Sequence, residues 1–383
     1  MSNTTEGKSY FDKDFFGNGF FDWQFSTGHH KKFWEERHYD EEKYWGGFSK
    51  EPFDAASYKL PPWAIGPFTK YEANPILAPD PDSWDCGHFG GGVHNGSCLI
   101  KDGKFYYIYR GEFPIDPKYQ VNDSLDYLCD VGVAVSDDGI HFKKLKEYGQ
   151  ALRPGGSEKY SFEDVNVVSH EGRYYMFLNR WDWAAPENPQ VCGTFIAVSD
   201  DLLHWEKKGL AFPNAKRIHR NACVLQNPHN EAVKVNGKFV MYINNGLMGF
   251  SDDLLHWESV ENPHSWPGGE CAVALADYCK DDPDAILLVT GGHHTGHFYA
   301  AGEVHFSKAN VMKPIEWLPR PVLIAEEKYP YEAGFSADGK EPVSYWRDTV
   351  FFTGITLHSG KWWAYYGGSE YYTCLATAPS RTA

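Results

Sequence analysis

The chain repeats itself, and this repeat restricts the possible fold more than any other feature. Three segments share an apolar strand, a Ser-Asp-Asp turn and a His-aromatic step into another strand: VGVAVSDDGIHFKKL (131–145), TFIAVSDDLLHWEKK (194–208) and GLMGFSDDLLHWESV (246–260). Short Ser and Asp side chains can hydrogen-bond their own backbone, which favours a turn between two strands. A weaker fourth copy covers residues 303–318. A recurrence of this kind predicts an architecture built from similar β units.

A second recurring unit precedes these copies and consists of a turn containing Gly followed by an aromatic strand. It occurs as KDGKFYYIYRGE (101–112), HEGRYYMFLNRW (170–181), VNGKFVMYINNG (235–246) and HSGKWWAYYGGS (358–369). The Gly step predicts a tight hairpin turn, and the alternation of aromatic and polar residues predicts half-buried strands. Together the two units predict a four-stranded antiparallel blade.

The chain contains five such units, and we therefore predict an all-β fold, a five-bladed β-propeller with an aromatic-rich N-terminal extension. The last blade needs a strand from elsewhere, for which the N-terminal region is the candidate. An immunoglobulin-like array is the alternative, but the Ser-Asp-Asp turns at 136, 199 and 251 lie 63 and 52 residues apart, which is too far for such domains. The blades are expected at 92–145, 162–208, 219–260, 268–318 and 344–378.

The region before the repeat, residues 1–70, is rich in aromatic, His and charged residues. We expect it to be an extension that packs on the propeller, and we expect residues 71–383 to form the catalytic domain. The aromatic residues of the extension could instead shape a substrate pocket or a subunit contact, so a homo-oligomer is a candidate assembly. The start lacks the basic and apolar segments of a secretory leader, which predicts a cytoplasmic protein, with a trimmed secreted or periplasmic form as the alternative.

Charge and cysteine usage exclude several classes of function. The 36 Lys plus Arg against 52 Asp plus Glu give a net charge of −16, and no basic stripe is present, so we expect neither a nucleic-acid nor a membrane partner. The eight cysteines are scattered, which predicts buried free thiols. Neither the cysteines nor the 17 histidines match a zinc signature, so no metal and no cofactor are expected.

The innermost strand of each propeller blade lines the axis, so polar residues just upstream of the Gly turns are expected to meet in the middle. The candidate catalytic carboxylates are Asp164, Glu231 and Glu270. The candidate substrate-binding residues are His94, Asn95, Arg110, Glu163, Asn166, Arg180, Trp181, Asp182, Arg220, Asn221, His293, His294, Arg347 and Asp348.

Several carboxylates in an aromatic-walled pocket suit glycoside chemistry. One acid can protonate the leaving oxygen while a second group assists attack at the anomeric carbon. An aromatic ring such as that of Trp181 can stack on the apolar face of a pyranose. For any single carboxylate, a turn or capping role is the alternative, and for the aspartates of the Ser-Asp-Asp turns it is the role we expect.

These motifs resemble glycoside hydrolase family 130, the five-bladed propeller family of mannoside phosphorylases and β-mannosidases. The resemblance covers about 62–378 and rests on the order of its motifs rather than on any one of them. The motifs are WAIGPFTKYEANPIL (63–77), DGKFYYIYRGE (102–112), FEDVNVV (162–168), the S-D-D-L-x-x-W turns, PVLIAEEKYPYE (321–332) and WWAYYGGSEYYTCLATA (362–378).

The resemblance implies roles for two residues. Asp164 falls on the aspartate of the family's Glu-Asp-Pro-Arg motif, which is the general acid, and Arg110 resembles the arginine that contacts sugar near the cleavage point. This chain departs from the motif directly afterwards, because Val165 and Asn166 stand where Pro and Arg are usual.

The resemblance also frames the choice between phosphorolysis and hydrolysis. Phosphorylase members bind phosphate with Arg, Lys and His residues, for which Arg220, Lys234 and His293 are candidate equivalents. Hydrolytic members use glutamates instead, and Glu231 and Glu270 lie in the matching blades. The missing Arg of the motif and these two glutamates favour hydrolysis.

We therefore predict an exo-acting, inverting glycosidase that hydrolyses β-mannosides or a related glycan, with a small oligosaccharide as its substrate. Glu231 and Glu270 would be the acid and base pair, and Asp164 would orient the sugar or donate a proton. A phosphate-dependent β-mannoside phosphorylase of the same fold is the first alternative. A non-catalytic carbohydrate-binding propeller is the second.

Overall fold

The computed structural model gives an all-β fold, which confirms the predicted class. In the part of the chain that the structure describes, the only helices are two short 3₁₀ helices, η2 (Lys146–Tyr148) and η3 (Pro330–Glu332). No helix there has the length and apolar character needed to span a membrane. The structure describes residues 59–114, 127–153, 160–182, 185–244, 246–264, 266, 270–291, 299–318, 321–326, 328–344, 346 and 349–381. The predictions for residues 1–58 lie outside this part of the chain.

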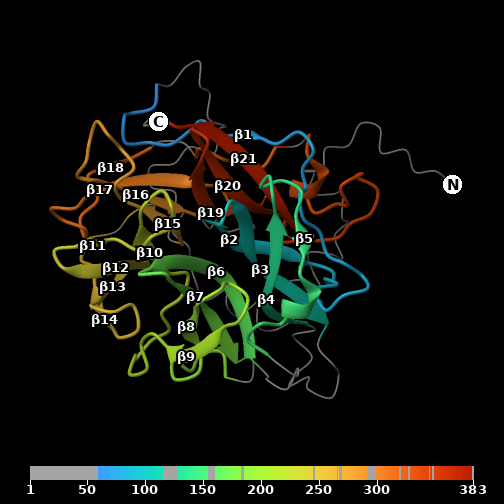
Figure 1. The fold of residues 1–383 in the computed structure, drawn as a ribbon, viewed down its shortest axis with the longest axis horizontal. Helices are drawn as coiled ribbons and strands as arrows, with labels where there is room; N and C mark the ends of the chain where they lie inside the picture. Colours follow the sequence, from blue (N-terminus) through green and yellow to red (C-terminus); the bar gives the residue numbers. More distant parts are fainter. Residues whose placement is uncertain are drawn as a thin grey trace.

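The strands of the described residues form four sheets (Figure 1). The largest sheet divides at the parallel pair of β10 and β15, which gives five antiparallel sets in chain order, apart from β1 in the fifth. The first set holds β2 (Val93–Lys101), β3 (Lys104–Pro114), β4 (Tyr127–Ser136) and β5 (Lys143–Lys144). The second holds β6 (Tyr160–His170), β7 (Arg173–Asp182), β8 (Gly193–Ser199) and β9 (Glu206–Leu210). The third holds β10 (Cys223–Gln226), β11 (Lys234–Val235), β12 (Lys238–Ile243), β13 (Leu247–Ser251) and β14 (Trp257–Glu261).

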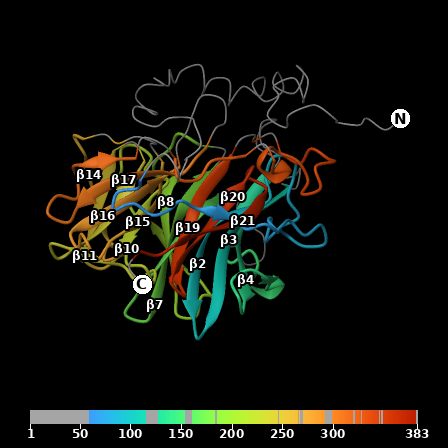
Figure 2. The same ribbon diagram turned by 90° about the horizontal axis from the view of Figure 1, so that it is seen from above.

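The fourth and fifth sets complete the fold. The fourth holds β15 (Cys271–Leu275), β16 (Ala285–Thr290), β17 (Gly302–Ser307) and β18 (Glu316–Trp317). The fifth holds β19 (Val350–His358), β20 (Lys361–Gly368), β21 (Tyr372–Pro379) and β1 (Thr69–Lys70). In the view turned by 90°, β2, β3, β19 and β20 run alongside one another (Figure 2).

The first strands of the five sets lie next to one another around a common centre. The Ser97 hydroxyl of β2 donates to the Val165 carbonyl of β6 at 2.9 Å and accepts from the Val167 N–H at 3.0 Å. The Asn166 side-chain oxygen of β6 accepts from the Val224 N–H of β10 at 3.2 Å. β10 pairs in parallel with β15, and β19 lies against both β15 and β2. The first strands thus form a closed ring.

Apolar side chains fill the spaces between successive sets. Aromatic residues from the second strands supply much of this core, and Tyr107, Phe177, Phe239 and Tyr365 are all buried. Burying a large apolar side chain stabilises the fold by about 1.5–3 kcal/mol relative to leaving it exposed. All eight cysteines are free, and seven are buried, as predicted.

The predicted Gly turns are two-residue hairpins with both residues in the left-handed region. Asp102 and Gly103 have φ values of 51° and 74°, and Glu171 and Gly172 have 49° and 78°. The turns at 236–237 and 359–360 repeat this conformation. A two-residue turn with positive φ at both positions matches the twist of antiparallel strands, which explains why Gly recurs at the second position.

The Ser-Asp-Asp turns share one hydrogen-bond pattern, which confirms the structural role predicted for the second aspartate of each turn. In the first turn, the Ser136 hydroxyl accepts from the backbone N–H groups of Asp138 and Gly139. One oxygen of Asp138 accepts from the backbone N–H groups of Ile140 and His141 at 2.9 and 2.8 Å, and the other oxygen contacts the His141 ring at 2.7 Å. The turns at 199–204 and 251–256 have the same contacts.

A segment before the repeat completes the fifth set. β1 pairs with β21, with Thr69 opposite Thr377. Just upstream, Leu60 and Trp63 are buried in the apolar core between the fourth and fifth sets. The predicted domain boundary at residue 70 therefore falls within a segment that pairs and packs with the sheets, and the described part of the predicted extension contributes to the fold.

A turn from the third set crosses the ring at one end. Asn230 donates from its side chain to the Ile355 carbonyl of β19 at 3.1 Å, and its own carbonyl accepts from the Ser169 N–H of β6 at 2.7 Å. The Leu357 N–H of β19 donates to the Pro228 carbonyl at 3.0 Å. Because β6 and β19 belong to the second and fifth sets, the turn at 227–231 spans the centre of the ring at the end where these strands finish.

The Ser97 bridge gives a test of the ring. Ser97→Ala should lower the free energy of unfolding by about 1–3 kcal/mol, because the buried Val167 N–H loses its acceptor. Ser97 is only 3% exposed, so water cannot easily replace the lost hydroxyl. Urea denaturation of the two proteins would measure the difference, and equal midpoints would contradict the proposed importance of this bridge.

Candidate active site

Polar side chains converge where the first strands begin, at the end opposite the 227–231 turn. Asn95, Asp164 and Asn221 occupy this end in the first, second and third sets, with φ values of 47°, 55° and 49°. Asn95 and Asp164 lie within register shifts of β2 and β6. A bulge redirects one side chain out of the strand's alternation, and Asn and Asp tolerate left-handed φ better than most residues.

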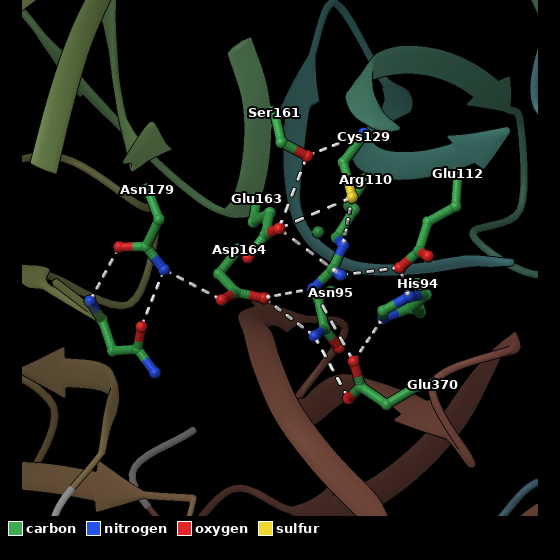
Figure 3. A network of polar contacts seen from close by, with 12 residues as sticks. His94, Asn95, Arg110, Glu112, Cys129, Ser161, Glu163, Asp164, Asn179 and Glu370 are labelled. Carbon is green, nitrogen blue, oxygen red and sulfur yellow. Dashed lines mark hydrogen bonds and ion pairs between the residues drawn. The ribbon is translucent and has the colours of Figure 1, made fainter. Parts of the chain in front are cut away.

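Asp164 lies at the middle of the polar network (Figure 3). Its Oδ1 accepts from Asn95 Nδ2 at 2.9 Å and from the Arg110 guanidinium at 3.3 Å. Its Oδ2 accepts from Asn179 Nδ2 at 2.9 Å. Asn179 in turn bonds the Asn221 side chain at 2.7 Å. Three N–H donors from β2, β3 and β7 therefore hold this carboxylate in one orientation.

Arg110 is the cation that links the carboxylates of the first, second and fifth sets. Its Nη2 lies 2.7 Å from Glu112 and 3.9 Å from Glu163. Its Nη1 lies 3.3 Å from Asp164 and 3.7 Å from Glu370. The side chain is 8% exposed, so the four ion pairs are largely shielded from water and interact more strongly than surface pairs.

Glu163 is buried beside Arg110 and has unusual protonation behaviour. Its Oε1 contacts the Ser161 hydroxyl at 3.5 Å and the Cys129 thiol at 3.7 Å. Burial raises the pKa of Glu163 to about 7; the charge of Arg110 opposes this increase, and the charges of Asp164 and Glu112 add to it. This carboxyl group can therefore exchange a proton near neutral pH.

Glu270 precedes β15 and is buried on the fourth set. Burial raises the pKa of Glu270 to about 7, the charges of Asp164 and Glu370 add to the increase, and Arg220 and a hydrogen bond from Asn221 oppose it. The Arg220 guanidinium lies over the Trp181 ring, 5.6 Å from its centroid. Two buried glutamates of different sets thus share Asp164 as a charged neighbour.

A second part of the network surrounds His94. Glu112 lies between two histidines, with His88 Nε2 at 2.6 Å from its Oε2 and His94 Nε2 at 2.9 Å from its Oε1. The other ring nitrogen of His94 lies 3.6 Å from Glu370. Glu370 follows β20 and has φ of 56°, which directs it toward the first set (Figure 3).

His94, Glu112 and Glu370 also satisfy the distance requirement for a metal site, because one potential ligand atom of each lies within 4.8 Å of the others. Arg110, however, forms ion pairs with both carboxylates. The guanidinium already supplies the positive charge that a metal ion would bring. The donor set therefore fits an ion-paired cluster better than a metal centre.

The structure brings together most of the sequence-predicted residues that it describes. These residues are His94, Asn95, Arg110, Glu163, Asp164, Arg220, Asn221 and Glu270. Four other candidates, His293, His294, Arg347 and Asp348, lie outside the described residues.

Glu231 requires a correction, because the structure does not bring it to the cluster. It is exposed on the 227–231 turn, where its backbone N–H donates to the Asn227 side chain at 3.1 Å. The strand that starts at the site in the third set is β10, which begins at Cys223, so Glu231 lies beyond the far end of that strand. Its predicted role in an acid and base pair with Glu270 therefore has no support.

The remaining candidates have structural contacts. Asn166 bonds the Val224 N–H and joins β6 to β10. Arg180 donates to the Val191 carbonyl at 2.9 Å and lies over the Tyr160 and Phe195 rings. Asp182 is buried next to Cys192, whose thiol accepts from its backbone N–H at 3.2 Å. The Trp181 ring lies beneath the guanidinium of Arg220.

The carboxylates Glu112 and Glu370 and the amide of Asn179 were not among the predicted residues, nor were His88, Cys129 and Ser161, which contact the cluster. Arg110 pairs opposite His94, and Asn179 pairs opposite Glu163, so the second strand of a set returns to the same end as the first. Polar residues at the ends of β3, β7 and β20 were therefore a usable signal. Glu112 even falls within the quoted motif DGKFYYIYRGE.

Comparison with known proteins relates the chain to mannoside-acting enzymes. No protein-family model matches it. A 1,2-β-oligomannan phosphorylase from Thermoanaerobacter sp. (strain X514) is 26% identical over 315 residues, which cover 77% of this chain and 92% of that protein. A β-1,2-mannobiose phosphorylase from the same strain is 24% identical over 326 residues, which cover 79% of this chain and 94% of that protein.

A solved structure extends the comparison to the fold. This structure represents the GH130 family of mannoside phosphorylases, which contains glycoside hydrolases that target β-1,2 mannosidic linkages in Candida mannan. It has a TM-score of 0.65 and 24% sequence identity, and the match covers 83% of this chain and 95% of that chain. These relationships confirm the resemblance: the chain is a homologue of mannoside phosphorylases and shares the fold of glycoside hydrolase family 130.

Proposed function

We propose that this protein is an exo-acting, inverting glycosidase that hydrolyses β-linked mannosides, with a small oligosaccharide as its substrate. The observation that carries this proposal is the pair of buried glutamates, Glu163 and Glu270. Both have a pKa raised to about 7 by burial, and both have Asp164 as a charged neighbour. A catalytic acid or base is most effective when its pKa lies near the working pH.

In the proposed reaction, one of these glutamates gives its proton to the glycosidic oxygen, and the bond from this oxygen to the anomeric carbon breaks. The other glutamate takes a proton from water, whose oxygen bonds the same carbon from the opposite face. An inverting reaction needs about 6.5–9.5 Å between the two carboxyl groups, to leave room for the water. Asp164, held by three N–H donors, would orient the sugar.

Two of the described cations, Arg110 and Lys234, favour water over phosphate as the attacking group. Arg110 is already engaged by four carboxylates. Lys234, a candidate phosphate ligand, is exposed and donates to the Asp252 carbonyl at 2.9 Å. A phosphate dianion beside Glu163, Asp164 and Glu270 would meet like charge, which is costly in a buried site.

Phosphorolysis is the second candidate, because the two relatives described above are named as phosphorylases. A test is product analysis after incubation with β-1,2-manno-oligosaccharides, with and without inorganic phosphate. We expect free mannose at equal rates under both conditions. Mannose phosphate formed only when phosphate is present would replace the hydrolytic proposal with the phosphorolytic one.

We also propose that the five strand sets are the blades of a five-bladed β-propeller. The closed ring of first strands and the apolar clusters between successive sets support this architecture. The exo-acting mode is supported by the 227–231 turn, which bonds β6 and β19 across the end of the ring away from Asp164. A substrate would then enter by one end only.

A further inference from the structure

The strongest unexplained feature of the site is one nitrogen of His94. The side chain is fully buried, and its Nε2 contacts Glu112 at 2.9 Å. Its Nδ1 is buried and has no hydrogen-bond partner among the described residues. The nearby Glu370 oxygen lies 3.6 Å away, which is too far for a direct hydrogen bond.

Carboxylates face both ring nitrogens of His94, with Glu112 2.9 Å from Nε2 and Glu370 3.6 Å from Nδ1, and this arrangement favours the protonated ring. The groups facing it are Arg110 and Glu112 from β3 and Glu370 from the turn after β20. Burial acts to lower the pKa of His94, but Glu370 and Glu112 outweigh burial and the opposing charge of Arg110, and the net shift is upward. A protonated ring makes both nitrogens donors. Nδ1–H is then a buried donor that points toward a carboxylate without reaching it.

Neighbouring groups keep Glu112 ionised and in contact with His94. Burial opposes ionisation of Glu112, but Arg110, His88 and His94 outweigh burial and hold its pKa below the usual value. His88 Nε2 lies 2.6 Å from one oxygen of Glu112, and the other His88 nitrogen lies 2.9 Å from the Phe89 carbonyl. A side chain at Gly91 would overlap the Glu112 carboxylate, so the glycine leaves the space that the pair occupies.

We propose that His94 Nδ1 and the Glu370 carboxylate form a binding position for one hydroxyl group of the glycan, and that Glu112, braced by His88, is the positioning residue that keeps His94 a donor there. A hydroxyl group can accept from Nδ1–H and donate to Glu370 at the same time. Such a hydroxyl group would give the buried Nδ1–H an acceptor. A buried donor without an acceptor lowers the stability of the protein. Neither a carboxylate nor an apolar group could make both contacts.

The position adjoins the proposed reaction centre. Asn95 Nδ2 lies 3.5 Å from Glu370 and 2.9 Å from Asp164, so one amide group bridges the two carboxylates. The hydroxyl bound by His94 and Glu370 would therefore belong to the sugar that Asp164 orients. This inference rests on the proposed function for its substrate class, while its contacts come from the described residues alone.

Two substitutions of His94 test the contributions of its two ring nitrogens separately. Asparagine at 94 can place an amide nitrogen near the position of Nδ1, whereas glutamine at 94 can place one near Nε2, where it still meets Glu112. On the wild-type enzyme, one member of a series of monodeoxy β-mannosides should lose about 10- to 100-fold in kcat/KM, the range for a hydrogen bond to a charged group. His94→Gln should show no further loss with that analogue, and His94→Asn should keep part of the discrimination.

The His94 ring can also be observed without turnover, by the NMR signal of its Cε1 carbon in the full chain, assigned by its absence in His94→Gln. Glu112→Gln should move the titration of this signal to lower pH. Methyl β-mannoside added to catalytically impaired Glu270→Gln protein should shift the signal. If the signal responds to the sugar but no variant or wild-type enzyme cleaves a mannoside, the proposed function fails and this inference stands. If wild type and His94→Gln discriminate all deoxy analogues equally, or if the sugar leaves the signal unmoved, the inference is overturned.

Discussion

Glu270→Gln and Glu163→Gln should each lower kcat on a β-mannobiose substrate by about 10²- to 10⁴-fold, the contribution typical of a general acid or base. The amide has nearly the same shape but can neither give nor take the proton. The two variants should differ on an aryl β-mannoside with a good leaving group. The variant that lacks the acid should recover much of its rate there, because a phenolate of low pKa leaves without protonation. The variant that lacks the base should stay slow and recover when azide is added as a nucleophile.

The chain offers a matched control for this experiment. Glu231→Gln makes the same chemical change on the exposed 227–231 turn, outside the cluster, and it should keep the wild-type rate. Large losses in Glu231→Gln and Glu270→Gln together with a normal rate in Glu163→Gln would restore the assignment made from the sequence. Normal rates in all three variants would show that none of these glutamates carries the catalysis, whereas no cleavage by the wild-type protein would favour a carbohydrate-binding protein without catalytic activity.

The pH profile should report the same two groups. The pKa values of Glu163 and Glu270 are both raised to about 7, and an inverting reaction needs one of them protonated and the other ionised. We therefore expect kcat/KM to be greatest near pH 7 and to fall on both sides. Toward high pH the acid loses its proton, and toward low pH the base gains one. Replacing either glutamate should remove one side of the profile.

The second large effect is expected at Arg110. Arg110→Gln should lower the free energy of unfolding at pH 7 by about 3–5 kcal/mol, the cost of leaving buried charges uncompensated. Glu112, Glu163, Asp164 and Glu370 all lie within 3.9 Å of the guanidinium. The deficit should shrink as the pH falls, because protonated carboxyl groups no longer repel one another. Urea denaturation at pH 7 and pH 5 would measure both effects.

Arg173→Gln is the control for this substitution. Arg173 forms an ion pair with Asp200 at 2.8 Å, but both side chains are largely exposed. Surface pairs of this kind contribute little, so the unfolding midpoint should barely change. Equal effects of Arg110→Gln and Arg173→Gln would show that the buried cluster does not depend on its central cation.

The local parts of the fold were readable from the sequence because short segments determine them. The Asp102–Gly103 turn needs two residues with positive φ, and the Ser136 turn is closed by hydrogen bonds within six residues. The start of the first strand was also readable in the first, second and fourth sets, where the sequence pointed to His94, Asp164 and Glu270. In each case the neighbouring residues carry the information.

The rest of the site depends on contacts between distant segments. Glu231 follows a short apolar strand and resembles a strand-start residue, but the direction of β10 is set by its pairing with β12 and β15, which puts Glu231 at the wrong end. Glu370 reaches His94 from 276 positions away along the chain. Its turn, with φ of 52° at Ser369 and 56° at Glu370, has no sequence signature comparable to the Gly turns.

The turn at 227–231 has a consequence for the order of events in the proposed reaction. Its hydrogen bonds to Ser169 and Ile355 tie the second and fifth sets together at the end of the ring away from Asp164. We expect that a glycan does not thread through such a ring, and that both products leave by the route along which the substrate arrived. Each cleavage should therefore end in complete release rather than in a processive step, and the released sugar should compete with new substrate for the same opening.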